Sequence, residues 1–123
     1  MDWPRPNGFA TVVAFADGNA SIYLSGGGGY LGGVSHESIR AAAQKAVEIA
    51  GDVRPQMKLT TTYPLPELGE IVFYALTDAG TFTVQAPEAE LRNGRSPFAK
   101  LGNAMQGVIT QYRLLQGQEP HAK

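Results

Sequence analysis

The chain has 123 residues, no cysteine and a formal net charge of −1. This length suits a single domain, residues 1–123, that buries its own core. The absence of cysteine excludes thiol catalysis, thiolate metal sites and disulfides. The balanced charge gives no electrostatic reason to expect nucleic acid or an anionic membrane as a partner. No run approaches the roughly 20 apolar residues that cross a bilayer, so we expect a cytoplasmic protein.

The amino-terminal part of the chain reads as an extended arm followed by a hairpin. Prolines hold residues 1–8 extended, because each fixes its own φ and restricts the residue before it. Apolar and small residues alternate over 9–16, and alternation resumes over 20–24, which predicts two strands. Asp17-Gly18-Asn19 between them is typical of a turn, so the two strands form a hairpin.

Two amphipathic helices are expected. The first begins after Ser35, whose hydroxyl can cap a helix, and ends at Gly51 as the residue after the C-cap. Its buried stripe is predicted to contain Ile39, Ala42, Ala43, Ala46, Val47 and Ala50. The second begins at Ser96-Pro97, with serine as the cap and proline in the first turn. Its buried stripe is predicted to contain Leu101, Ala104, Met105, Val108, Ile109, Tyr112 and Leu115. We expect the polar residues 117–123 to be a disordered tail.

Three further strands lie between these helices. Residues 57–63 are rich in threonine and bounded by prolines, which favours an edge strand. Residues 71–76 and 81–86 flank a turn with glycine at its end, which predicts a second hairpin. The loop after it is polar and contains a helical turn around Glu88. The element order is therefore ββα–βββα, an α+β fold in which two helices cover one antiparallel sheet of about five strands.

This order of elements resembles the roadblock/dynein light chain family and the wider profilin-like folds. The resemblance covers roughly residues 9–115 and rests on the two turns, Ala16-Asp17-Gly18 and Thr77-Asp78-Ala79-Gly80. It implies a non-enzymatic subunit of a homodimer or heterodimer, of the kind that attends small GTPases or motor complexes. No catalytic residue is carried over by the resemblance.

The glycine-rich stretch from Ser25 to Gly33 is the first candidate site. Gly27, Gly28, Gly29, Ser35 and His36 could bind an anion or small molecule, because backbone donors of the loop would join those of the following helix start. The pattern Gly27-x-Gly29-x-x-Gly32 formally matches a dinucleotide fingerprint, but an antiparallel hairpin precedes it and the chain is short for a dinucleotide domain. The simpler interpretation, which we favour, is a connecting loop.

A second anion site is possible at Arg92, Arg95, Ser96 and Lys100, where cations flank a helix start. A solvated loop is the simpler interpretation and the one that we prefer. With His36 as the one histidine of the folded region, the sequence predicts no metal site and no cofactor. Two functions therefore stay open, and the sequence offers no set of catalytic residues for either of them. The first is a non-catalytic dimeric interaction module, and the alternative is a small-molecule or anion-binding protein, conceivably a minor enzyme, that uses the glycine loop.

We predict that the chain forms a homodimer through the edge strand at residues 57–63, with Met57, Leu59 and Thr61 in the interface. An edge strand leaves backbone donors and acceptors unpaired, and a second copy can complete them across a two-fold axis. Light scattering should return twice the monomer mass of 13.1 kDa. A monomer mass at high micromolar concentration would contradict the prediction.

Overall fold

The computed structural model describes residues 1–30 and 36–118. The strands, in chain order, are β1 (Asp2–Arg5), β2 (Gly8–Ala14), β3 (Ala20–Leu24), β4 (Gly29–Tyr30), β5 (Lys58–Thr60), β6 (Glu70–Thr77) and β7 (Gly80–Pro87). The helices are α1 (Glu37–Val53), α2 (Glu88–Arg92) and α3 (Ala99–Gln118), and a short 3₁₀ turn, η2 (Arg54–Gln56), follows α1. The chain is therefore an α+β protein, as the sequence predicted.

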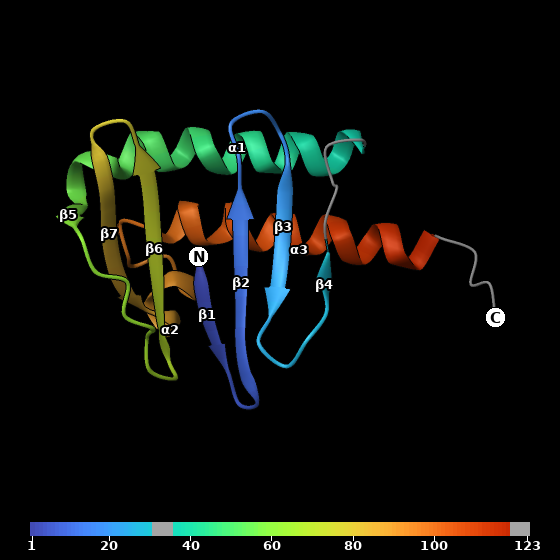
Figure 1. Ribbon diagram of the computed structural model, residues 1–123, viewed down its shortest axis with the longest axis horizontal. Helices are drawn as coiled ribbons and strands as arrows, with labels where there is room; N and C mark the ends of the chain where they lie inside the picture. Colours follow the sequence, from blue (N-terminus) through green and yellow to red (C-terminus); the bar gives the residue numbers. More distant parts are fainter. Residues whose placement is uncertain (31–35, 119–123) are drawn as a thin grey trace.

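The strands form one antiparallel sheet in the order β4-β3-β2-β1-β6-β7-β5. Figure 1 looks onto this sheet, with all three helices lying behind it and α1 and α3 running across the strands. The described residues therefore form two layers, one sheet and one layer of helices, and none of their helices lies on the other face of the sheet. The order also divides the sheet into two groups, β4-β3-β2 and β6-β7-β5, with β1 between them.

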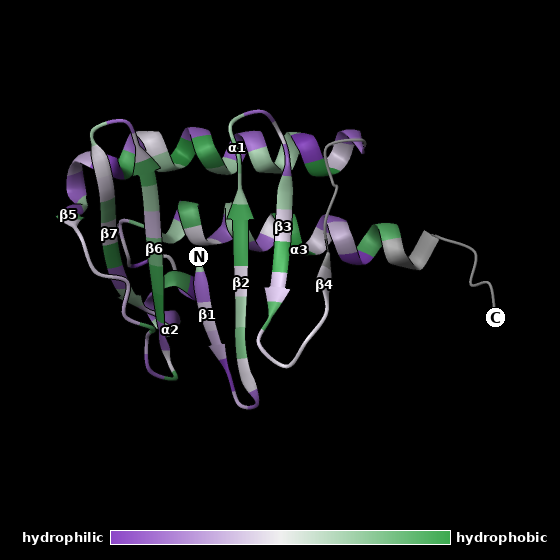
Figure 2. Cartoon of the chain, in the orientation of Figure 1, coloured by the Kyte–Doolittle hydropathy of each residue, from purple (hydrophilic) through white to green (hydrophobic). Residues whose placement is uncertain are grey.

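The core lies between the helices and the sheet. Val12 of β2, Ile39 of α1 and Val108 of α3 are completely buried in it. The hydroxyl of Tyr112 in α3 donates to the carbonyl of Ala20 in β3 over 2.6 Å, which fixes the helix against the strand. Figure 2 shows hydrophobic residues along β2, β3 and β6 and hydrophilic residues at the turn between β1 and β2. Burial of apolar side chains on this one face is the main stabilising contribution.

Both predicted hairpins are confirmed. Strands β2 and β3 pair from Ala10 opposite Leu24 to Ala14 opposite Ala20, and β6 and β7 pair along their full length. The stripe predicted for α3 is buried or partly buried at every position. These elements depend on short-range periodicity and turn residues, which the sequence displays directly.

The number of elements was wrong. Among the described residues the sheet has seven strands rather than about five, and there are three α-helices rather than two. The added helix is α2, at the helical turn expected around Glu88. The added strands are β4, which is two residues long, and β1, which is four. Such short strands carry too few alternating residues to produce a periodic pattern.

Residues 1–8 are extended as expected, but they are not an arm. β1 occupies the middle of the sheet, and Met1 is buried. Proline is unusual in a central strand because it cannot donate a ladder hydrogen bond. Met1 exchanges backbone hydrogen bonds with Val12, so by strand alternation Pro4 turns its nitrogen away from β2. On that side, β1 is paired with β6 at Asp2 alone, and the missing donor costs no ladder bond.

Several predicted element boundaries also differ. Gly51 lies inside α1, which continues to Val53 because the amide of Arg54 still bonds to the carbonyl of Ala50. Helix α3 begins at Ala99 rather than at Ser96. Ser96 instead stabilises the preceding turn, where its hydroxyl accepts a 3.0 Å hydrogen bond from the amide of Phe98. Residues 117 and 118 are helical rather than part of a tail, and 119–123 lie outside the described residues.

Replacing Gly107 by alanine should stabilise the protein. Gly107 lies within α3, and an added Cβ there would meet nothing within 4 Å. Glycine in a helix interior costs about 0.5–1 kcal/mol relative to alanine, so the free energy of unfolding in urea should rise by about that amount. A decrease would show that another surface packs against this position.

The matched comparison is Gly29→Ala in β4. There φ is +152°, and the new Cβ would lie 2.1 Å from the carbonyl oxygen of Ile22. This substitution should lower the free energy of unfolding, because the β3–β4 pairing must shift to admit the methyl group.

Candidate functional site

Within the glycine-rich stretch, residues 25–28 form a turn between β3 and β4, and residues 31–33 lie outside the described residues. The amide of Gly27 donates to the carbonyl of Leu24 over 3.0 Å, and the amide of Leu24 donates to Gly28 over 3.3 Å. Gly27 and Gly28 both have positive φ, which explains the residue type. Gly29 pairs with Tyr23 in β4. The backbone amide of Gly27 is therefore already hydrogen-bonded within the hairpin, so it does not point to a ligand.

The structure does not bring the glycine turn and His36 together. Figure 1 places the turn at the lower end of the sheet and the start of α1 at the upper end. His36 precedes α1 in an extended conformation, and its side chain makes no capping hydrogen bond. Ser35, the predicted cap, lies outside the described residues. A ligand shared by the turn and the helix start has no support in this arrangement.

The second predicted anion site is also divided. Arg92 forms an ion pair with Glu88 four residues earlier, and the hydroxyl of Ser96 is buried and occupied by the amide of Phe98. Arg95 and Lys100 are exposed at the surface. Two of the four predicted members thus have partners inside the protein, and the solvated-loop interpretation fits the other two.

The predicted edge strand is confirmed in position, since β5 lies at one end of the sheet. Leu59 in β5 is 63% exposed, and Thr61 beyond its end is also exposed. Met57 is different, because its side chain is buried in the core and cannot contact a second chain. Met57 directly follows the 3₁₀ turn after α1, and its amide donates to the carbonyl of Arg54.

An opening in the middle of the sheet provides a stronger candidate site. β1 pairs with β2 from Asp2 opposite Thr11 to Arg5 opposite Gly8, but it is paired with β6 only through Asp2 opposite Val72. Beyond this pair, β2 and β6 continue upward in Figure 1 on either side of the position marked N. In residues 1–30 and 36–118, no strand lies between these upper halves.

A cleft of about 660 Å³ fills this opening. It has the size typical of ligand pockets, which run from about 300 to 1,000 Å³. Small and apolar residues line it on three sides: Val12 and Ala14 from the β2 side, Phe73 and Ala75 from β6, and Ala46 and Ala50 from α1. Alanine at four of these six positions explains the free volume, because each side chain extends only one carbon atom into the cleft.

Polar groups are few and lie at the margins of the cleft. The Met1 amino group donates to the carbonyl of Val12 over 2.8 Å, and burial lowers its pKa to about 6, although the nearby Asp2 carboxylate opposes the shift. That carboxylate accepts a 2.8 Å hydrogen bond from the hydroxyl of Thr11. At the open face, the rings of Tyr63 and Tyr74 lie 5.2 Å apart between centroids. Partial burial, and then the Asp2 charge, raise the pKa of Tyr74.

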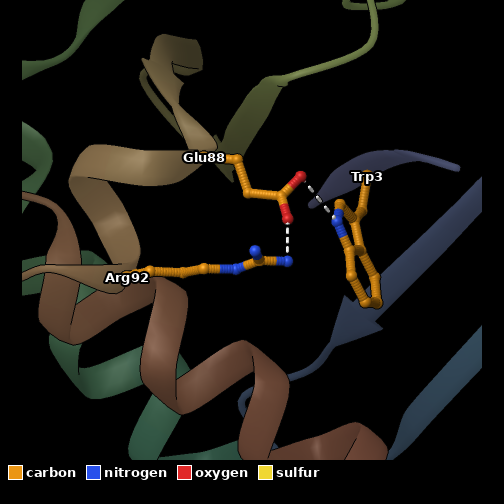
Figure 3. Close-up of polar contacts among 3 residues, drawn as sticks. All are labelled: Trp3, Glu88 and Arg92. Carbon is orange, nitrogen blue, oxygen red and sulfur yellow. Dashed lines mark hydrogen bonds and ion pairs between the residues drawn. The ribbon is translucent and has the colours of Figure 1, made fainter.

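Contacts between side chains hold β1 in place below the cleft. In Figure 3 the carboxylate of Glu88 lies between Trp3 and Arg92, accepting a 3.2 Å hydrogen bond from the indole nitrogen and pairing with the guanidinium. The guanidinium of Arg5 lies 4.2 Å from the centroid of the Trp3 ring on the same strand. These contacts connect β1 to α2 in the part of the strand that lies beyond the cleft.

The chain matches no protein-family model, no curated protein and no solved structure. The resemblance to the roadblock family therefore stays a prediction. Within the described ranges, no helix has the length and apolar character needed to span a bilayer.

Sequence reasoning did not find the cleft. Its lining residues were interpreted as ordinary strand and helix positions, and the opening depends on how far β1 extends between two distant strands. The sequence contains one indication of the cleft. Ala14 and Ala75 occupy inward positions of two central strands, where larger β-branched residues are usual, and both stand opposite the alanine stripe of α1.

The buried amino group predicts a pH dependence of stability. For a chain that begins at Met1, its pKa is about 8 when unfolded and about 6 when folded. The unfolded state therefore binds more protons between these values, and the free energy of unfolding should rise from pH 6 to pH 8 by about 2 kcal/mol. Urea titrations across this range measure the slope.

Histidine is a residue type that can change charge near neutral pH, so the control replaces both histidines of the sequence, His36 and His121, by glutamine. The slope should persist in that variant. A slope that vanished with the histidines would contradict its assignment to Met1.

Proposed function

We propose that this protein is a non-catalytic binding module whose ligand occupies the cleft between β2 and β6. The observation that supports the proposal most strongly is the volume of about 660 Å³, open at the free face of the sheet and lined mainly by apolar side chains. A pocket of this size with few polar groups at its margin is the usual form of a ligand site. The ligand is expected to be apolar where it contacts Ala46 and Ala50.

A binding role is favoured over catalysis by the chemistry of the lining. Among the described residues that line the cleft, the ionisable groups are the Met1 amino group, Asp2, Arg54 and two tyrosines. The Asp2 carboxylate is engaged with Thr11, and the Arg54 guanidinium lies 5.0 Å from the centroid of the Phe82 ring. These groups do not form the pair of nucleophile and base that acyl or phosphoryl transfer requires.

Protein contacts are a second part of the proposal. The resemblance to roadblock proteins implies dimerisation and a protein partner such as a small GTPase, and the exposed Leu59 on edge strand β5 is the feature that favours such a contact. This interface would lie at the end of the sheet, and β7 alone separates β5 from β6, which forms one wall of the cleft. A substitution in α1 leaves β5 unchanged, so the two surfaces can be tested by separate variants.

Replacing Ala50 by phenylalanine should abolish ligand binding to the cleft. The new ring would extend from α1 into the space between β2 and β6, while the backbone hydrogen bonds of the helix are unchanged. Fluorescence titration with Nile red, an uncharged apolar dye, measures the effect. We expect a saturable signal for the natural chain and at least a tenfold weaker one for Ala50→Phe, a loss of about 1.4 kcal/mol.

The matched control is Ala41→Phe on the same helix, where the side chain is exposed to solvent. This variant should bind the dye like the natural chain, and both variants should show the helical circular dichroism of the natural chain. Equal dye binding by Ala50→Phe and the natural chain would contradict the location of the site.

A further inference from the structure

We propose that Asn93 is a site of spontaneous deamidation, at which the loop between α2 and α3 acquires an aspartate or isoaspartate without the action of an enzyme. Asn93 precedes Gly94 in an exposed turn. Within residues 1–30 and 36–118, no backbone hydrogen bond outside the helices and strands has the amide of Gly94 as its donor. Asn93 does not line the cleft, so this modification is independent of the proposed function.

Deamidation of an Asn-Gly pair begins when the backbone nitrogen of glycine attacks the side-chain carbonyl carbon of asparagine. The carbon–nitrogen bond of the side-chain amide breaks, and its nitrogen leaves as ammonia with the proton that the backbone nitrogen gives up. A succinimide ring results, and water opens it at either carbonyl to yield aspartate or isoaspartate. Asparagine is thermolabile, and a following glycine favours attack because it has no Cβ to shield its nitrogen.

The chain contains two Asn-Gly pairs, Asn7-Gly8 and Asn93-Gly94. Both asparagines are exposed, and each pair lies at a turn. Composition and exposure therefore do not distinguish the two pairs. The hydrogen bonding of the two glycine nitrogens does distinguish them.

The nitrogen of Gly8 is held in the sheet. Met1 and Val12 exchange two backbone hydrogen bonds, with nitrogen–oxygen distances of 2.8 and 2.9 Å. Hydrogen-bonded pairs alternate along an antiparallel ladder, so the pair of Arg5 and Gly8 is of the same kind. The amide of Gly8 thus donates to the carbonyl of Arg5 and closes the turn. Attack on Asn7 requires this bond to break.

The next residue adds to this restraint. The amide of Phe9 donates to the hydroxyl of Ser25 over 2.8 Å, and the amide of Ser25 donates to the carbonyl of Phe9 over 3.0 Å. A Cβ added at Gly8 would lie 2.2 Å from the same hydroxyl, so the turn packs closely against Ser25. Opening the turn at Asn7 disturbs both β1 and the end of β3.

The surroundings of Gly94 are different. Its φ of +79° ends α2 in the left-handed conformation that is common after a helix. The amides of the next two residues, Arg95 and Ser96, both donate to the carbonyl of Glu90, over 3.1 and 3.2 Å. These bonds bypass Gly94 and leave its nitrogen exposed beside Asn93.

Ring closure at Asn93 needs a change confined to this loop. The Cα–C bond of Asn93, with ψ of 1°, must rotate to bring the nitrogen of Gly94 against the side-chain carbon. The rotation breaks a 3.0 Å hydrogen bond from the amide of Arg95 to Oδ1 of Asn93. That amide keeps the carbonyl of Glu90 as an acceptor, so no donor is left unpaired. We therefore expect Asn93 to react while the protein stays folded.

Isoaspartate changes the loop, because the main chain then passes through Cβ and is one carbon longer. The loop is anchored on both sides by buried side chains, Leu91 before it and Phe98 after it. A longer loop shifts α2, whose Glu88 accepts the 3.2 Å hydrogen bond from Trp3. Trp3 is the single tryptophan of the chain, so its fluorescence reports this shift.

The experiment ages the natural chain at mildly alkaline pH, folded in buffer and unfolded in urea. Cleavage after glutamate places Asn7 and Asn93 in different peptides, in which mass spectrometry follows conversion of each amide to an acid. A methyltransferase specific for isoaspartate identifies the product. We expect folding to slow Asn7 at least about tenfold, because it reacts only from opened states, and to slow Asn93 by less than tenfold.

Two variants provide the controls for Trp3 fluorescence. Asn93→Gln keeps an amide but removes the reactive pair, and Asn7→Gln does the same at the other turn. Ageing should change the fluorescence of the natural chain and of Asn7→Gln, and should leave that of Asn93→Gln unchanged. Melting temperatures measured before ageing confirm that both variants are folded.

Three results would overturn the inference. Slowing of Asn93 by tenfold or more on folding would show that the loop protects it. Reaction of Asn7 as fast as Asn93 in the folded chain would show that the bond from Gly8 to Arg5 does not decide between the pairs. Unchanged Trp3 fluorescence in a chain that contains isoaspartate at position 93 would show that α2 does not move.

Discussion

The pairing of Met1 with Val12 is the constraint on which the sheet depends. Two backbone hydrogen bonds at this pair fix the upper end of β1, and the contact of Trp3 with Glu88 fixes the strand against α2. The groups β4-β3-β2 and β6-β7-β5 are joined in the sheet through this four-residue strand. This strand pairs with β2 along its whole length but with β6 only through Asp2.

The helical layer holds the two halves together where β1 does not. Val12, Ile39 and Val108 come from β2, α1 and α3 and are completely buried together in the core. Burial of such a side chain contributes about 1.5–3 kcal/mol, which is more than a typical net hydrogen bond supplies. An interrupted sheet is therefore tolerable, because packing against α1 and α3 replaces the missing ladder bonds. The alanines of α1 let the helix lie close to the strands.

The same arrangement gives the cleft its character. Its walls are strands paired on their far sides, so they are rigid, and its floor is a helix with small side chains. Unpaired strand edges at the outside of a sheet promote aggregation. Here the edge groups lie inside the sheet, between β2 and β6.

The sequence by itself determined the α+β class, both hairpins, the buried stripe of α3 and the edge position of the strand near Leu59, because alternation and turn residues act over short distances. Tertiary structure decided the rest. β1 became a central strand because Met1 meets Val12, a pairing that two prolines gave no reason to expect. Gly51 is helical because the hydrogen bond from the amide of Arg54 to the carbonyl of Ala50 extends α1 beyond Gly51. The cleft between Ala14 and Ala75 depends on two strands about sixty residues apart in the chain, and local patterns cannot report the distance between segments that only packing brings together.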